Sequence, residues 1–198
     1  MRKSALALVS VASWLLSASV ASAVAPVEDI PISGKKIVVK DNVVAAKRKV
    51  AFVSKDQALV ADALDPTDNG ASFYLVDPSL GQQSSVFDMP ASSWESKNGK
   101  YVYTDKGLVH GPVKKAKLKD GLLKIVLKGT GIDFPVLGVA PLGEVGGVFT
   151  VNTQVGVFNV CFLFPGDDGV VKKDSPVKGV YKAVNAESPD FCPSIIVP

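Results

Sequence analysis

The chain has 198 residues, of which 47% are hydrophobic, with 22 Lys and Arg against 19 Asp and Glu, one His and two Cys. This length fits one ordinary domain, and the formal charge of +3 is small. No run of five or more Lys or Arg remains after the first residues, so the sequence predicts no nucleic-acid partner.

The first 23 residues have the composition of an export signal. Residues 1–3 are positively charged, an apolar run covers residues 5–16, and Ala23 ends a small-residue motif of the kind that signal peptidases cut. A retained membrane anchor, the alternative, needs roughly 18 consecutive apolar residues. We therefore expect residues 1–23 to be removed. This lowers the formal charge from +3 to +1 and leaves a chain without a membrane span, in the periplasm or outside the cell.

The rest of the chain alternates apolar and polar residues with a period of two, which is typical of β-strands. Residues 24–34 contain prolines and are predicted to form a mobile lead-in or an edge strand, followed by a single β domain over residues 35–198. About nine or ten short strands are expected, in one antiparallel β-sandwich or, alternatively, a small β-barrel. One helical turn is predicted within residues 56–64.

The clearest local signal is a β-hairpin over residues 113–129, joined by an Asp-Gly pair that suits a two-residue type I′ turn. Pairing across this turn places Leu118 opposite Leu123 on one face and Lys117 opposite Lys124 on the other. We interpret the apolar face as packed on the core. The lysines are interpreted as a solvated face rather than a binding stripe.

A second hairpin is expected around residues 152–154, with Phe162 on the core face of its second strand and Cys161 on the opposite face. Cys161 and Cys192 are the only cysteines, and in an oxidising compartment such a pair typically forms a disulfide. The predicted bridge closes a loop of about 30 residues and contributes roughly 3–4 kcal/mol of stability. Two buried free thiols are the alternative.

Residue types that carry catalysis are scarce. His110 is the single histidine, and no HExxH, GxSxG, GxGxxG or P-loop motif occurs. Asp88, Glu95 and Asp105 form a loose group of carboxylates from which a glycosidase pair can be drawn, although surface acids at this density are ordinary. The sequence predicts no catalytic residue, no cofactor and no enzymatic activity, with a small extracytoplasmic hydrolase as an alternative.

Aromatic residues gather in one stretch of the chain. Trp94 is the only tryptophan after the predicted signal peptide, and Tyr101 and Tyr103 share one face of a strand. Exposed aromatics on a β scaffold stack on sugar rings, whereas buried ones seal a core. A carbohydrate-binding surface at these three residues is therefore an alternative to their burial.

A turn-rich stretch offers the one candidate for a metal site. Asp65, Asp68 and Asn69 carry oxygen atoms of the kind that bind Ca²⁺. The same residue types form ordinary turns, and their spacing does not match an EF-hand loop. No metal site is predicted, and calcium at these residues stays the weaker alternative.

Several short motifs follow one another in a distinctive order over residues 47–193. They are Lys47-Arg48-Lys49-Val50-Ala51-Phe52-Val53-Ser54-Lys55-Asp56, Asp65-Pro66, Gly70-Ala71, Met89-Pro90-Ala91-Ser92-Ser93-Trp94, Tyr101-Val102-Tyr103-Thr104-Asp105, Gly111-Pro112-Val113-Lys114-Lys115 and Phe191-Cys192-Pro193. In this order the chain resembles a family of uncharacterised exported bacterial β domains. The resemblance implies secretion and one β domain, and it implies no activity or ligand. Two further cysteines often occur on the hairpin in that family, and Val113 and Leu127 occupy those places here.

The sequence thus predicts an exported, non-enzymatic β-sandwich module with a binding, adhesion or envelope-structural role. Its partner is not identified by any motif, and a glycan or another envelope component is the candidate. The alternatives are the carbohydrate-binding module built on Trp94, Tyr101 and Tyr103, and the small hydrolase.

Overall fold

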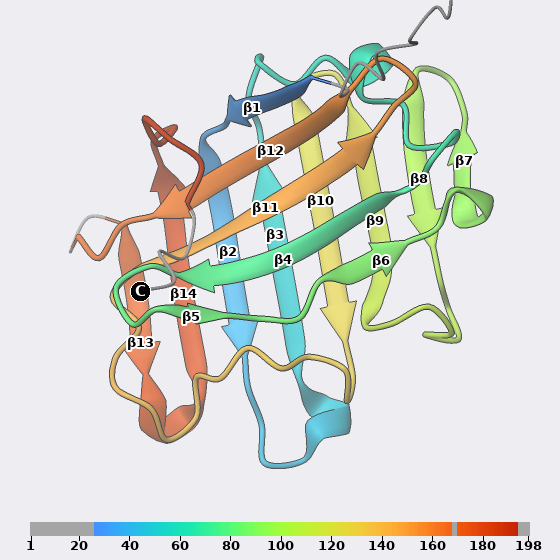
Figure 1. Ribbon diagram of the computed structural model, residues 1–198. Helices are drawn as coiled ribbons and strands as arrows, with labels where there is room; N and C mark the ends of the chain where they lie inside the picture. The colour runs from blue at the N-terminus through green and yellow to red at the C-terminus, as the bar shows by residue number, and fades with distance from the viewer. Residues whose placement is uncertain (1–25, 168–169, 194–198) are drawn as a thin grey trace, which may run out of the picture.

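The computed structural model describes residues 26–167 and 170–193, so the predicted signal peptide (residues 1–23) lies outside the described residues. Fourteen strands form two open sheets that pack face to face, and the described chain contains short 3-10 turns but no α-helix (Figure 1). The predicted all-β sandwich is confirmed. The strand count of nine or ten was too low, because strands such as β5 (Gln82–Gln83) and β6 (Phe87–Met89) are too short to show alternation.

The eight-stranded sheet, called sheet B below, is antiparallel throughout and contains the predicted Asp-Gly hairpin. Leu118 pairs with Leu123 and Lys117 with Lys124, as the sequence predicts. The spatial order of its strands is β13 (Val171–Ser175), β14 (Val180–Ala186), β2 (Gly34–Lys40), β3 (Lys49–Ser54), β10 (Leu122–Lys128), β9 (Val113–Lys119), β8 (Lys100–Thr104) and β7 (Trp94–Ser96).

The six-stranded sheet, called sheet A, is mixed. Its edge strand β1 (Val27–Pro31) runs parallel to β12, whereas the other pairs are antiparallel. Residues 27–31 of the predicted lead-in therefore form an edge strand, which is one of the two alternatives that the sequence left open there, and not a mobile segment. The path continues from β1 to β12 (Val157–Phe164), β11 (Val145–Asn152) and β4 (Ala71–Asp77), and β4 pairs with both β5 and β6.

Aromatic side chains from both sheets fill the space between them. Phe52 of sheet B stacks on Phe162 of sheet A, with ring centroids 3.6 Å apart, and both rings are fully buried. At Gly34 a Cβ atom would lie 2.4 Å from the Phe164 ring, so this position on β2 accepts only glycine without repacking. Because the inner faces are packed in this way, the outer faces and the loops are the surfaces that can receive a ligand.

The C-terminal segment is tied to the outer side of sheet A. Cys161 on β12 and Cys192 form the predicted disulfide, with their Cα atoms 5.4 Å apart. The disulfide holds the following residue, Pro193, against Gly146 on β11. On the outer side of sheet B, by contrast, Lys36 and Lys124 are exposed.

One ion pair, between the buried Asp41 and the partly exposed Arg48, holds the long connection between β10 and β11. Asp41 is 8% exposed, and its Oδ1 lies 2.8 Å from Arg48 Nε in an ion pair. The second carboxylate oxygen of Asp41 accepts the backbone amides of Val136 and Leu137, and Arg48 Nη1 donates to the Ile132 carbonyl at 3.0 Å. Arg48 is the single arginine of the described chain, and its guanidinium is occupied by this structural contact.

Candidate functional site

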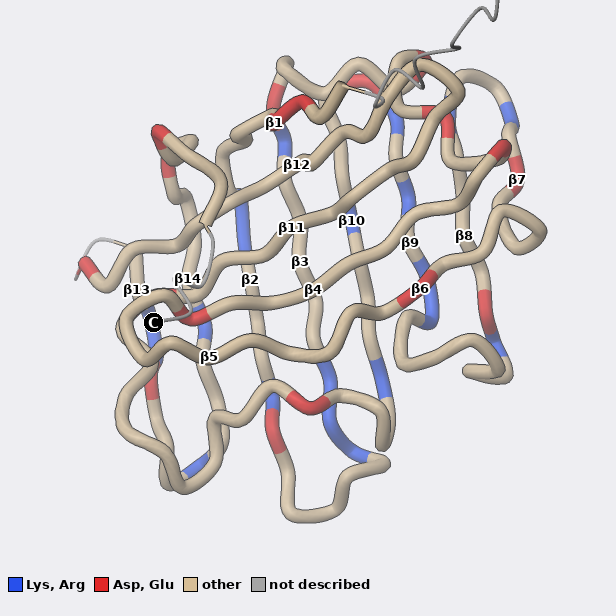
Figure 2. The backbone as a smooth tube through the Cα atoms, viewed as in Figure 1, with Lys and Arg blue, Asp and Glu red and all other residues tan. Residues whose placement is uncertain are grey.

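Charge is divided between the two sheets. The strands of sheet A carry four acids and no Lys or Arg, whereas the strands of sheet B carry fourteen lysines and two acids, Glu95 and Asp174. Blue segments accordingly follow the strands of sheet B in Figure 2, while β1 and β6 of sheet A carry red. The small net charge of the chain conceals this separation, because the acids lie mostly in loops and on the other layer.

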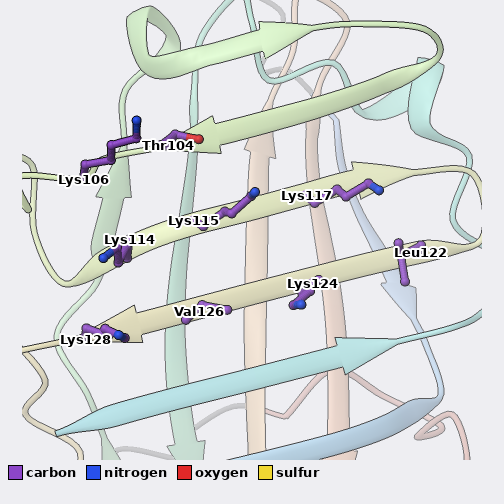
Figure 3. Close-up of a pocket in the computed structure, with 9 residues that line it drawn as sticks. All are labelled: Thr104, Lys106, Lys114, Lys115, Lys117, Leu122, Lys124, Val126 and Lys128. Carbon is purple, nitrogen blue, oxygen red and sulfur yellow. The ribbon is translucent and has the colours of Figure 1, made fainter. Parts of the chain in front are cut away.

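A groove of about 680 Å³ lies on the outer face of sheet B, over strands β8, β9 and β10 (Figure 3). Its volume falls within the range of about 300–1,000 Å³ that is typical of ligand sites. Six of its nine lining residues are lysines, and none is acidic or aromatic. The lining residues are Thr104, Lys106, Lys114, Lys115, Lys117, Leu122, Lys124, Val126 and Lys128.

Strand alternation places most of these lysines on the outer face. Along β10 the residues Leu123 and Ile125 are fully buried, so Lys124 between them faces solvent, as does Lys128 at the end of the strand. A register shift near Val126 interrupts the pairing of β9 with β10. Because Val113 and Ala116 are both buried, this irregularity leaves two consecutive residues, Lys114 and Lys115, on the outer side. The irregularity therefore adds one more positive charge to the groove than a regular strand would supply.

Lysines face each other directly across neighbouring strands of this face. Lys117 pairs with Lys124, and at one end of the sheet Lys49 lies opposite both Lys40 and Lys128. Side chains at such paired positions have Cβ atoms about 5 Å apart, and like charges placed there destabilise a sheet. The facing lysines therefore lower the stability of the folded protein. Stabilisation of the sheet does not explain their presence.

The lysines of the groove have no acidic partners within the described residues. Arg48 and Asp41 form an ion pair, but neither residue lines the groove. Glu95 lies on the edge strand β7, and Val102 on β8 stands between it and Lys117 on β9. The positive potential of the face is thus not neutralised by its own sheet, which makes it a place where anions gather.

The aromatic residues predicted as an alternative ligand surface are buried. Trp94, Tyr101 and Tyr103 are 6%, 7% and 0% exposed. The Trp94 indole donates to the Met89 carbonyl at 3.2 Å, and its ring lies against Tyr103 and Phe149. Burial, followed by the charge of Asp105, raises the pKa of Tyr103 to about 12. These residues seal one end of the core, so the alternative of a carbohydrate-binding surface at Trp94, Tyr101 and Tyr103 is wrong and their burial describes them.

The candidate carboxylates lie on separate elements. Asp88 is exposed on β6 of sheet A, Glu95 is exposed on β7 of sheet B, and Asp105 is 7% exposed in the loop after β8. Burial raises the pKa of Asp105, but the backbone amide of His110, at 2.8 Å, and those of neighbouring residues outweigh burial and hold this pKa below its ordinary value. Asp105 therefore stays ionised and caps a loop, which is not the protonated state that a general acid needs.

Two of the three weak calcium candidates accept hydrogen bonds from protein groups. Asp65 Oδ1 accepts the backbone amide and the hydroxyl of Thr67, at 2.8 and 2.6 Å, and Asp68 Oδ2 accepts Gln154 Nε2 at 3.0 Å. Asn69 is exposed. Within residues 26–167 and 170–193, no three His, Cys, Asp or Glu side chains come together as metal ligands. The ordinary-turn interpretation thus describes Asp65, whereas Asp68 accepts a hydrogen bond from a loop distant in the sequence.

Comparisons with known proteins identified no relative of this chain. No protein-family model, curated protein or solved structure matches the chain. The resemblance to an exported bacterial β family therefore stays a prediction. The described residues also contain no helix that is long and apolar enough to cross a membrane.

Proposed function

We propose that the protein is an exported, non-enzymatic β-sandwich module that binds an anionic polymer through the outer face of sheet B, in an adhesion or envelope-structural role. The observation that carries this proposal is the set of six groove lysines without acidic partners among the described residues, two of which, Lys117 and Lys124, oppose each other across β9 and β10. Sequence alone suggested a solvated face. The concave shape of the surface and its unneutralised charge support a binding face instead.

Export is supported by two independent features. The predicted signal peptide directs the chain out of the cytoplasm, and the disulfide between Cys161 and Cys192 is of a kind that persists in oxidising compartments. In such a compartment the polyanions within reach belong to the cell envelope or its surroundings. An exposed lysine face is suited to them, because lysine is a flexible, well-hydrated point charge that adapts to irregularly spaced anions.

The proposal is tested by retention of the exported protein on a sulfated dextran resin, with neutral dextran as the reference. The groove variant carries Lys115→Ala, Lys117→Ala and Lys124→Ala. The control variant carries Lys47→Ala, Lys97→Ala and Lys178→Ala, which remove the same charge from exposed lysines outside the groove lining.

We expect the wild type and the control to bind sulfated dextran and the groove variant to elute at clearly lower salt. Three exposed charge contacts of about 0.5 kcal/mol each amount to about a tenfold loss of affinity. Equal elution of the groove and control variants would show that net charge, not this face, governs binding. If the wild-type protein is not retained on sulfated dextran at all, the proposed function is wrong.

A further inference from the structure

The composition of the groove restricts the kind of polyanion that fits it. We infer that the ligand is an acidic polysaccharide, a chain of sugar rings bearing carboxylate or sulfate groups, that lies across strands β8, β9 and β10. This inference rests on the proposed function, because it names the ligand class of the same face.

The dimensions of the groove favour a chain over a single small anion. From Lys124 to Lys128 the face extends about 13 Å along β10, at roughly 3.3 Å per residue. From β10 to β8 it extends about 10 Å, at roughly 4.8 Å between strands. Lysines are spread over this area: Lys124 and Lys117 lie toward one end, Lys128 and Lys114 at the other, and Lys106 beyond the end of β8 (Figure 3). One anion reaches only part of this set, whereas a chain with repeated charges reaches all of it.

The floor between the lysines is aliphatic. Val126 and Leu122 line the groove half-buried, and Val102 on β8 continues the same outer surface. The C–H faces of sugar rings gain dispersion contacts on such a floor, while their acidic substituents reach the lysines around it. The hydroxyl of Thr104, at the end of β8, adds a hydrogen-bonding group of the kind that sugars use.

The same composition disfavours nucleic acid. Proteins that hold single strands combine a basic groove with aromatic side chains on which bases stack, and no aromatic residue lines this groove. Phosphate recognition favours the planar fork of arginine. The single arginine of the described chain, Arg48, is bound to Asp41 and Ile132. Aliphatic contacts and dispersed point charges therefore match an acidic sugar chain better than a phosphodiester chain.

The experiment measures affinity by calorimetry at fixed ionic strength. It uses sulfated and carboxylated oligosaccharides from disaccharide to decasaccharide, the matching neutral oligosaccharides, and single-stranded DNA of the same charge as the longest acidic sugar. We expect both acidic series to tighten by about tenfold with length and then level off once the chain spans the groove. Neutral sugars should give no measurable heat, and DNA should bind at least about tenfold more weakly than the acidic decasaccharide.

The same titrations on the two triple variants separate the possible failures. The groove variant should lose the dependence on length, and the control variant should keep it. DNA binding as tight as that of the acidic sugar, or no gain from disaccharide to decasaccharide, would overturn this inference while the proposed anion binding stands. If none of the anionic chains binds the wild type, both the inference and the proposed function fail. Tightening in the sulfated series alone would assign sulfate, and in the carboxylated series alone would assign carboxylate, as the group recognised.

Discussion

Lys117 and Lys124 lie directly opposite each other on β9 and β10, facing solvent, and neither forms an ion pair with a described residue. Such a pair destabilises a sheet by a few tenths of a kcal/mol. The same register places Leu118 against Leu123 on the inner face, where both are fully buried. One hairpin thus contributes to the core on one side and to an unneutralised positive face on the other.

Reversing one charge of this pair should stabilise the protein while weakening its binding. Lys117→Glu replaces a repulsive cross-strand pair with an attractive one, so we expect the free energy of unfolding to rise by about 0.5 kcal/mol and the melting temperature by about 1–2 °C. Thermal unfolding at low and high salt measures this, and the gain should shrink as salt screens the pair. Lys97→Glu, in an exposed turn, is the matched control. A destabilised Lys117→Glu would show that the repulsion is not significant.

Trp94 should behave as a core residue. We expect Trp94→Ala to lower the free energy of unfolding by roughly 3–5 kcal/mol, because it removes a buried aromatic ring. Trp94→Phe should cost less, since it mainly removes the indole hydrogen bond to Met89. Denaturant titration gives both values, and the Trp94 fluorescence of the wild type should not change when an acidic polysaccharide is added. A Trp94→Ala protein as stable as the wild type would contradict the burial described above.

The disulfide should be complete in the exported protein and should stabilise it. Non-reducing mass spectrometry should find no free thiol. Replacing Cys161 and Cys192 together with serine should lower stability by roughly 3–4 kcal/mol, because the bridge closes a long loop of the unfolded chain. The double substitution avoids a leftover thiol. Two alkylatable cysteines in the native exported protein would argue against an oxidising location.

Removing the buried carboxylate of Asp41 should destabilise the protein. Asp41→Ala takes away the charge that faces the partly exposed Arg48 and leaves the amides of Val136 and Leu137 without their acceptor, so we expect the free energy of unfolding to fall by about 2–3 kcal/mol. Hydrogen exchange at these two amides should accelerate far more than exchange within β10. Arg48→Lys keeps the charge but not the planar geometry and should lie between the wild type and Asp41→Ala. Unchanged protection of Val136 and Leu137 would show that Asp41 does not hold this connection.

Asp105 should make the stability of the folded protein depend on pH in the acidic range. Its pKa in the folded protein lies below the ordinary value of 3.8, so its contribution to stability is present above that value and is lost as the pH falls through the folded pKa. Asp105→Asn should therefore lose stability at neutral pH and show a smaller further loss on acidification than the wild type. Melting curves between about pH 7 and pH 2.5 cover this range. Parallel pH profiles of the two proteins would contradict the assignment.

The local parts of the fold could be predicted because short-range patterns determine them. The Asp-Gly turn fixed the register of Leu118 with Leu123, and alternation around Phe162 placed Cys161 on the outer side, where it meets Cys192. Edge strand β1 was harder to assign, because its pairing with β12 spans 130 residues of chain at Asp29 and Asn159 and leaves no local signal.

The candidate site could be predicted only in part, for the same reason. The sequence shows that Lys117 faces Lys124, but it does not show that β10 lies beside β3 or that Lys49 therefore meets Lys128. A strict alternation of two also cannot predict the irregularity that places both Lys114 and Lys115 on the outer side. A search of the sequence for runs of Lys and Arg therefore underestimates the positive charge of this face, because its lysines come from strands that are distant in the sequence. The burial of Trp94 depends on packing against Phe149 from the other sheet, which sequence patterns do not report.

The salt dependence of binding to one sulfated polysaccharide distinguishes the lysine face of sheet B from net charge as the source of affinity. Each lysine that neutralises an anion releases a counterion, so log affinity should fall with log salt concentration more steeply for the wild type than for the groove variant, by a slope difference of about two to three. The control variant, with the same net charge as the groove variant, should keep nearly the slope of the wild type. Equal slopes for the groove and control variants would show that the lysine face of sheet B is not where the polyanion binds.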